Sequence, residues 1–337
     1  MAARAEWLFR QKNSSATVTD LVGEKVRVFR HDPHEHKTLE YAGLTRRGTP
    51  VFVNRLLLEA DYVVLCGSVV SHPFAGYSNG PRLIVPGCAG AETIHRHFSH
   101  TLDPETQQVH ARCRDAAIDG NPLQEDSREA FRFITASFLL HTILNDQGQI
   151  VGAVAGDPLQ AFAAGCKAIE SMCGATAANL VIVSCGGYPN DGDFRAAYAA
   201  LQRATQIVRP DGVIIFVAEC RDGLGDFLTQ RLAVATTQNF RLPQEISSSR
   251  ARWLEQNTIE ALIASAIHQK TREHRIIFVT DLPSALIERA GFIPATSLSA
   301  ALTLAEKTLS PPKPRLAGDF FSAILISNGT FSVPHLI

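Results

Sequence analysis

The sequence lacks the features of membrane, exported and nucleic-acid-binding proteins. Its longest apolar runs, such as Val213–Val217, are far shorter than the roughly 18 residues that a membrane helix needs. The first residues, MAARAEWLFRQKNSS, contain no apolar core of signal-peptide length. The 32 basic and 33 acidic residues leave a net charge of −1, without a long block of one sign that would attract nucleic acid. We therefore expect a cytoplasmic protein that binds neither a membrane nor nucleic acid.

The cysteines lack the paired CxxC spacing of zinc and redox sites. Most lie within apolar runs, where cysteine behaves as a small hydrophobic side chain, so we predict buried thiols. Cys185 could instead be reactive, because it opens a glycine loop. The seven cysteines are Cys66, Cys88, Cys113, Cys166, Cys173, Cys185 and Cys220.

What the sequence does contain is enough apolar material for a folded protein of two domains. It has 337 residues, of which 45% are hydrophobic and 19% charged, whereas a domain usually holds about 100 to 200 residues. The helical pattern from Pro158 precedes a second series of strands and helices, which makes it the expected bridge. We predict one domain over residues 1–160 and another over 161–337.

Short β-rich runs alternate with longer helical patterns along the chain, which predicts an α/β fold with mostly parallel sheets flanked by helices. The predicted strands are Thr49–Val53, Tyr62–Cys66, Phe138–Leu144, Ile150–Val154, Val181–Ser184, Val213–Val217 and Ile276–Val279. The predicted helices are Glu125–Phe138, Pro158–Met172, Asp193–Val208, Leu224–Ala235, Thr258–His268 and Ser297–Thr308.

The segment Ser71–Arg82 follows a predicted strand, where α/β proteins place ligand-binding loops. Gly76 and Gly80 permit unusual backbone conformations, so successive N–H groups could converge on an anion, with Ser78 and Arg82 as further donors. The same residues also fit a plain turn with a structural His72.

Three histidines follow within six residues, on a helix that we expect to begin near Ala91. His97 and His100 would share one face of that helix and could bind nickel, zinc, copper or iron. The alternative is a solvated polar face, which we favour for His95. Nearby acids such as Asp115 and Asp126 are interpreted as helix caps or solvated groups.

These motifs resemble the nickel-dependent lactate racemases and their relatives. The shared pattern is His-x3-Gly-[FY]-Ser-x-Gly-x-[KR]-x3-Pro-Gly, followed by Glu-Thr-Ile and histidine, and it spans His72–Gly87 and Glu92–His95 here. The resemblance continues through Gly120-Asn121-Pro122, Ala155-Gly156-Asp157 and Gly186-Gly187-Tyr188-Pro189.

The resemblance implies a two-domain racemase or epimerase of a small 2-hydroxy acid, with a nickel pincer nucleotide in the cleft between domains. A pyridinium carbon of that cofactor would take a hydride from the carbon bearing the hydroxyl group, while histidines move the hydroxyl proton. His72 matches one of these bases, and the enzymes that make the cofactor would be partners. The implied cofactor contacts are Gly76, Tyr77, Ser78, Gly80, Arg82, Gly186 and Gly187, and GxGxxG is absent at the last two.

Several positions depart from the family. Arg82 replaces the lysine that tethers the cofactor, which implies a non-covalent cofactor, and Phe98 aligns with the nickel-binding histidine, which leaves His97 or His100 as substitutes. Ala196 and Ala199 replace substrate-binding side chains. This chain starts after the family's N-terminal Asp-x-Thr-Arg and Gly-Thr-His motifs, so either Met1 is an internal or misassigned start or the chain is a natural reduced form.

Two further hypotheses therefore stay open. The first is a reduced, non-catalytic relative that keeps an anion- or nucleotide-binding pocket. The second is a zinc- or iron-type site at His97 and His100.

Overall fold

The computed structural model describes residues 5–9, 26–106, 108–145, 147–171, 177–224, 262–264, 266–309 and 322–329. The described strands are β1 (Ala5–Phe9), β2 (Val26–Arg30), β3 (Leu39–Leu44), β4 (Pro50–Asn54), β5 (Val63–His72), β6 (Gly76–Ser78), β7 (Ala136–Leu144), β8 (Ile150–Gly156), β9 (Ala178–Ser184), β10 (Val208–Val217), β11 (Arg275–Val279), β12 (Ile293–Ala295) and β13 (Ala323–Ile326). The helices are η1 (His36–Thr38), α2 (Leu56–Glu59), η2 (Gly80–Leu83), α3 (Ala91–Ser99), α4 (Pro122–Phe131), α5 (Pro158–Ser171), α6 (Phe194–Ile207), α9 (Ser284–Arg289) and α10 (Leu298–Leu309).

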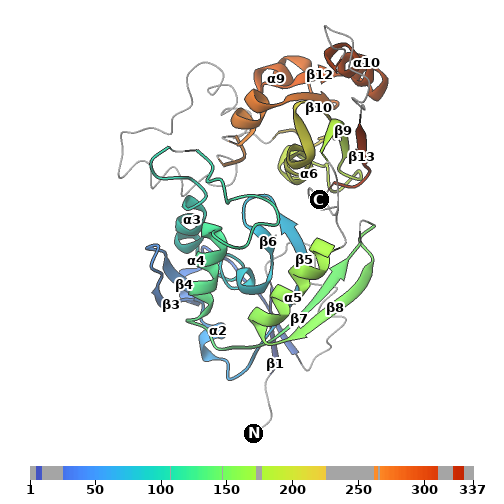
Figure 1. The fold of residues 1–337 in the computed structure, drawn as a ribbon. Coiled ribbons are helices and arrows are strands. Elements are labelled where there is room, and N and C mark those ends of the chain that lie inside the picture. The colour runs from blue at the N-terminus through green and yellow to red at the C-terminus, as the bar shows by residue number, and fades with distance from the viewer. Residues whose placement is uncertain are drawn as a thin grey trace.

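The chain forms two units, one above the other in Figure 1. We call the described residues up to 171 the N-terminal unit and the described residues from 177 onward the C-terminal unit. The N-terminal unit contains a four-stranded sheet of order β6-β5-β7-β8, in which β5 and β7 are parallel and the other two pairs antiparallel. Two two-stranded sheets, β1-β2 and β3-β4, complete the described strands of this part.

Helix α5 packs on the four-stranded sheet because its apolar residues recur at helical spacing. Ala161, Phe162, Cys166 and Ile169 are buried along one side. Gly165 brings the helix close to the sheet, since a Cβ there would lie 2.6 Å from Val69. By its packing α5 therefore belongs to the N-terminal unit, and the domain division near residue 160 stays a prediction.

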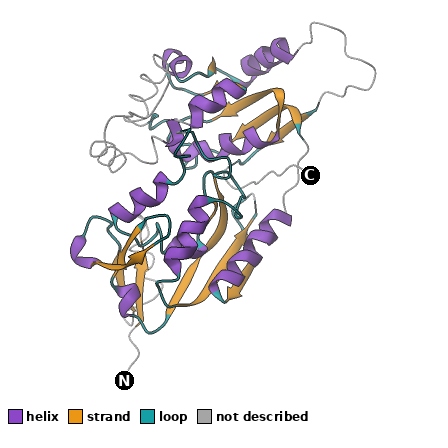
Figure 2. Ribbon diagram, turned by 60° about the vertical axis from the view of Figure 1, so that its left-hand side comes forward, coloured by secondary structure: helices purple, strands orange, loops and turns teal. Residues whose placement is uncertain are grey.

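The C-terminal unit contains a five-stranded parallel sheet of order β12-β11-β10-β9-β13. Val213–Phe216 of β10 are buried, as expected for a central parallel strand covered on both faces. Helices α6 and α10 lie against this sheet (Figure 2).

The predicted α/β class is confirmed, but the two units differ in strand direction. The C-terminal sheet is all parallel, whereas the N-terminal sheet is mixed because short turns join β5 to β6 and β7 to β8. The helix predicted over Glu125–Phe138 is wrong at its end, since α4 stops at Phe131 and β7 begins at Ala136. Most of the helix predicted over Leu224–Ala235 lies outside the described residues.

The cysteine prediction is mostly confirmed. Burial raises the pKa of Cys185 to about 12, which argues against a reactive thiolate. Cys66 is exposed, contrary to the prediction, and Cys173 lies outside the described residues. Cys113, Cys166, Cys185 and Cys220 are buried and Cys88 is half-buried.

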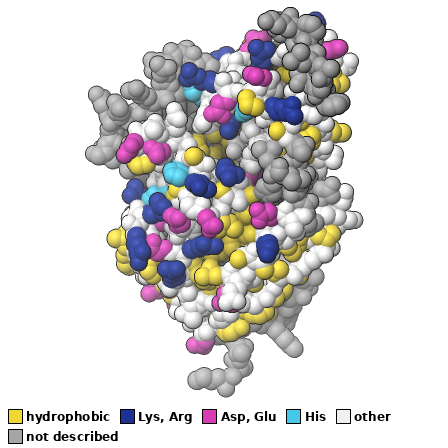
Figure 3. Space-filling model, in the orientation of Figure 1, with side chains coloured by type: hydrophobic (Ala, Val, Ile, Leu, Met, Phe, Trp, Pro, Cys, Tyr) yellow, Lys and Arg dark blue, Asp and Glu magenta, His cyan; other side chains and the backbone are white. Residues whose placement is uncertain are grey.

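The outer surface is mixed in character. On the face seen in Figure 3, apolar side chains gather mainly in the lower half, where the N-terminal unit lies. Within the described part of the chain, no helix has both the length and the apolar character to cross a bilayer.

Candidate functional site

The site begins at the hairpin between β5 and β6. His72 ends β5 and pairs with Gly76, while Ser71 pairs with Tyr77. The start of α4 stabilises this turn, because the Gln124 amide donates to the carbonyls of Ala75 (2.6 Å) and Tyr77 (2.8 Å). The hairpin is therefore a fixed structure rather than an open loop.

The glycines of this segment are explained by close packing. Gly76 has φ +75°, and a Cβ there would clash with the carbonyl of Ala117. Gly80 has φ +58°, and a Cβ there would clash with the Phe162 ring. Tyr77 is buried and Ser78 half-buried in the same hairpin. Whether any of them contacts a cofactor stays a prediction.

His72 is half-buried and its ring is oriented by the backbone. Its Nδ1 accepts from the N–H groups of Phe74 (3.1 Å) and Ala75 (3.0 Å). Burial lowers the pKa of His72 well below its ordinary value, and the nearby positive charge of Arg82 adds to the shift. A neutral His72 therefore carries its proton on Nε2 and presents a donor there, whereas a general base needs a free lone pair.

Arg82, at the end of η2, is a buried guanidinium with 6% of its surface exposed. Its Nη1 lies 3.1 Å from His97 Nε2, and its Cζ lies 5.8 Å from the centre of the Phe98 ring. No carboxylate in the described part of the chain forms an ion pair with it. Burial lowers the pKa of Arg82 to about 10, which still leaves it charged at neutral pH.

His97 and His100 lie on one face of α3, as predicted, and both point toward Asp126 of α4. His97 Nδ1 lies 2.8 Å from Asp126 Oδ2, and His100 Nε2 lies 3.9 Å from Asp126 Oδ1. Because Arg82 has only donors, His97 must accept with Nε2 and donate from Nδ1. Burial lowers the pKa of His97, which fits a neutral ring.

Asp126 is fully buried and accepts several hydrogen bonds. Thr45 Oγ1 donates to its Oδ1 at 2.7 Å, and Thr49 Oγ1 donates to its Oδ2 at 3.1 Å. Burial alone would raise the pKa of Asp126, but hydrogen bonds from His97 and Thr45 outweigh it and lower the pKa. A carboxylate, an imidazole and a guanidinium thus form one buried line from Asp126 through His97 to Arg82.

The residues of this line do not fit nickel in the way that the resemblance implies. Phe98, at the position of the family's ligand, is 4% exposed and has no donor atom. Both ring nitrogens of His97 are engaged, and His100 Nε2 lies 2.9 Å from Thr49 Oγ1. Among the described residues, no three His, Cys, Asp or Glu side chains are grouped to hold a metal ion.

Gly186 and Gly187 join β9 to α6 in the C-terminal unit, both with φ near +80°. Gly186 lies against the Asn328 side chain, and the next residue, Gly329, donates its N–H to the Ser184 carbonyl at 2.7 Å. On α6, Ala196 is exposed and Ala199 half-buried, and the methyl side chain of each has no hydrogen-bond donor.

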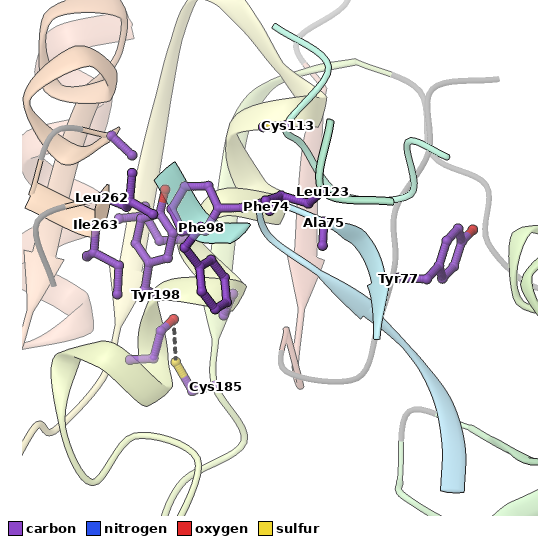
Figure 4. Close-up of a cluster of buried hydrophobic side chains, with 14 of the residues drawn as sticks. Phe74, Ala75, Tyr77, Phe98, Cys113, Leu123, Cys185, Tyr198, Leu262 and Ile263 are labelled. Atoms are coloured by element: carbon purple, nitrogen blue, oxygen red, sulfur yellow. Dashed lines mark hydrogen bonds between the residues drawn. The ribbon is translucent and has the colours of Figure 1, made fainter. Parts of the chain in front are cut away.

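Arg203 of α6 connects this loop to the hairpin. The buried guanidinium donates to the Gly329 carbonyl and to Ser71 Oγ, and its Nε lies 3.3 Å from Asp115 Oδ2. Beside it the Phe74 and Tyr198 rings stack at 5.7 Å, as Figure 4 shows, with Phe98 drawn in the same buried cluster. His72 thus lies next to the junction of the two units.

Thr45, Thr49 and Arg203 were not predicted, and the interpretation of two acids as caps or solvated groups is wrong. Asp126 is fully buried beside His97, and Asp115 is fully buried beside Arg203. A usable signal existed for Asp126, since it falls on the buried side of a helix whose start is fixed by the Asn121-Pro122 cap.

Comparison with known proteins gives the same family for both parts of the chain. A family model described as "Lactate racemase N-terminal domain" matches residues 9–109, and one described as "Lactate racemase C-terminal domain" matches residues 173–315. Together they match more than half of the chain.

Two curated relatives are lactate racemases. The protein from Thermoanaerobacterium thermosaccharolyticum is 28% identical over 285 residues, which are 83% of this chain and 65% of that protein. The protein from Lactiplantibacillus plantarum is 26% identical over 282 residues, or 81% and 64% of the two chains. The chain therefore spans slightly less than two thirds of either relative.

Solved structures share the fold. The lactate racemase apoprotein from Thermoanaerobacterium thermosaccharolyticum superposes with a TM-score of 0.80 at 24% identity, covering 100% of this chain and 79% of that one. The crystal structure of a protein from Thermotoga maritima gives a TM-score of 0.63 at 15% identity, covering 99% and 86%.

Proposed function

Because this chain belongs to the lactate racemase family, we propose that it binds a small 2-hydroxy acid through the Arg82 guanidinium, without a nickel ligand. The observation that carries the proposal is the charge state of Arg82, a cation that is 6% exposed and has no ion-pair partner among the described residues. A buried charge without a counter-ion is costly, so an anionic ligand would stabilise it.

The chemistry around Arg82 suits a carboxylate with a neighbouring hydroxyl group. Guanidinium binds carboxylate through two parallel N–H donors, and the Nε2–H of neutral His72 is a further donor next to the junction of the units. In this proposal His72 binds the ligand and does not take up its proton, since its Nδ1 lone pair already accepts two backbone N–H groups.

A racemase or epimerase of the same acids is the second candidate, favoured by the family and by the two racemases among its relatives. That activity would need the nickel pincer nucleotide, whose chemistry is hydride transfer at the carbon bearing the hydroxyl group. Arg82 and Phe98, at the positions of the tether and the nickel ligand, argue against it.

The test is calorimetric titration of the protein with L-lactate and D-lactate, with the neutral lactamide as the matched ligand. We expect lactate binding that weakens about 10- to 100-fold in Arg82→Met, the cost of losing a charged hydrogen-bonding partner. Arg55→Met, an exposed arginine paired only with Glu59 at 3.8 Å, is the control and should bind normally.

The two candidates can be separated by producing the protein together with the enzymes that make the nickel nucleotide and measuring its nickel content and racemase activity. We expect no stoichiometric nickel and no interconversion of the lactate enantiomers. One nickel per chain together with racemisation would establish the second candidate, and equal binding by Arg82→Met would remove the first.

A further inference from the structure

We propose that His97 and Asp126 are positioning residues that orient the Arg82 guanidinium for its ligand. This inference rests on the proposed function, because it concerns the same cation. Neither residue touches the ligand in this proposal; both act through Arg82.

The first step is the direction of the hydrogen bonds. Arg82 Nη1 can only donate, so His97 accepts at Nε2 and its proton sits on Nδ1, where it is donated to Asp126 at 2.8 Å. Thr45 and Thr49 donate to the same carboxylate, one to each oxygen. The carboxylate therefore fixes the imidazole tautomer, and the imidazole fixes one corner of the guanidinium.

The second step is which part of Arg82 stays free. A guanidinium offers two edges for bidentate binding, and His97 takes Nη1, a member of one of them. No described residue accepts from Nε or Nη2 of Arg82. The free Nε–Nη2 edge matches a planar carboxylate, which favours a carboxylic acid as the ligand.

The third step is the packing that holds this arrangement. His97 and Asp126 are 0% exposed, and the Phe98 ring lies beside the guanidinium, with its centre 5.8 Å from Cζ. Water has little access to loosen these bonds, so the arrangement exists before any ligand arrives and saves the ordering cost of binding.

The decisive variants are His97→Leu and Asp126→Asn. His97→Leu removes the acceptor, and Asp126→Asn replaces one acceptor oxygen by a donor and frees the His97 tautomer. We expect lactate to bind at least tenfold more weakly to His97→Leu and measurably more weakly to Asp126→Asn. His141→Leu is the matched control, a buried histidine of the same unit outside this network, and should bind lactate as the wild type does.

A second measurement does not depend on binding. Nitrogen NMR of histidine-labelled protein, with His97 assigned by its loss in His97→Leu, should show protonated Nδ1 and unprotonated Nε2, and a smaller excess of this tautomer in Asp126→Asn, where the bond from Arg82 still favours it. If wild type binds none of the acids, the proposed function fails and the tautomer still decides this inference. A proton on Nε2, or unchanged lactate affinity in a folded His97→Leu, would overturn it.

Discussion

His141 of β7 is a buried histidine whose two ring nitrogens have no hydrogen-bond partner among the described residues. It pairs in register with Gly67 of β5 and meets the Phe162 ring edge-on, with the ring centres 6.3 Å apart. Burial lowers its pKa to about 4, so it is neutral in the folded protein at ordinary pH. The position costs stability that an apolar side chain would not.

We predict that His141→Leu stabilises the protein by about 1 kcal/mol at pH 7, because it removes buried polar atoms that lack partners. The folded-state pKa is about 4 and the ordinary value 6.5, so between these values the unfolded state holds more protons. Stability at this site is therefore lost as pH falls from 6.5 to 4. Urea denaturation at pH 7 and pH 5 should show a larger gain at pH 5, and an equal gain at both would contradict this origin.

Single residues show where the sequence was a sufficient guide and where it was not. The shared face of His97 and His100 followed from helical spacing alone. Helical spacing could also have placed Asp126 on the buried side of α4, but it could not supply its partners Thr45 and Thr49, which come from a strand turn some 80 positions earlier in the chain. Spacing reports local geometry, whereas partners of this kind are set by the packing of distant segments.

At the scale of elements, the β5–β6 hairpin depends on its turn more than on its three-residue second strand. Gly76 closes it with φ +75°, directly against the carbonyl of Ala117. The turn between β7 and β8 offers a matched comparison, because Gly148 has φ +76° with nothing within 4 Å of its Cβ position.

We predict that Gly148→Ala costs about 1 kcal/mol, the strain of a positive φ alone. Gly76→Ala should cost more, at least about 3 kcal/mol, because the added methyl group also displaces the Ala117 backbone. Thermal unfolding of both variants measures the difference. Equal losses of stability in the two variants would mean that the hairpin accommodates the added methyl group at Gly76 without further strain.

Apolar runs located β4, β7, β8, β9 and β11 correctly, but they could not give strand direction. In the C-terminal unit a helix separates most of the strands, and parallel pairing follows from the crossover. In the N-terminal unit the deciding features are the short turns after His72 and Leu144, and the first lies in a segment whose sequence predicts a loop. The short strands β12 and β13 carry too few residues to show a period.

At the scale of the whole molecule, Arg203 forms a polar contact between the two units. It is 2% exposed, it faces Asp115 of the N-terminal unit, and it donates to Ser71 and Gly329. No local pattern in the sequence indicates such a contact, since its partners lie in three separate segments. The residues that meet between the two domains could therefore not be identified from the sequence.

We predict that Arg203→Met destabilises the protein by about 3 to 5 kcal/mol, because it removes a buried ion pair with Asp115 and the buried donors to Ser71 and Gly329. Scanning calorimetry should then resolve two transitions, one for each unit. The double variant Arg203→Met/Asp115→Leu should recover part of the loss. Arg46→Met, which breaks a surface pair with Glu129 at 3.7 Å, should cost less than about 1 kcal/mol. A single transition, with a loss of stability in Arg203→Met as small as that in Arg46→Met, would contradict this role of Arg203.

The reach of Arg203 also bears on how the protein is made. Ser71 precedes it by 132 residues and Gly329 follows it by 126, so its three kinds of partner leave the ribosome at very different times. A nascent chain that has completed α6 but not β13 holds a guanidinium that is only partly satisfied and lacks the Gly329 carbonyl. Its contacts with Ser71 and Asp115 of the N-terminal unit are available as soon as α6 has been made, but the buried guanidinium gains its last acceptor only when the C-terminal sheet has been completed by β13.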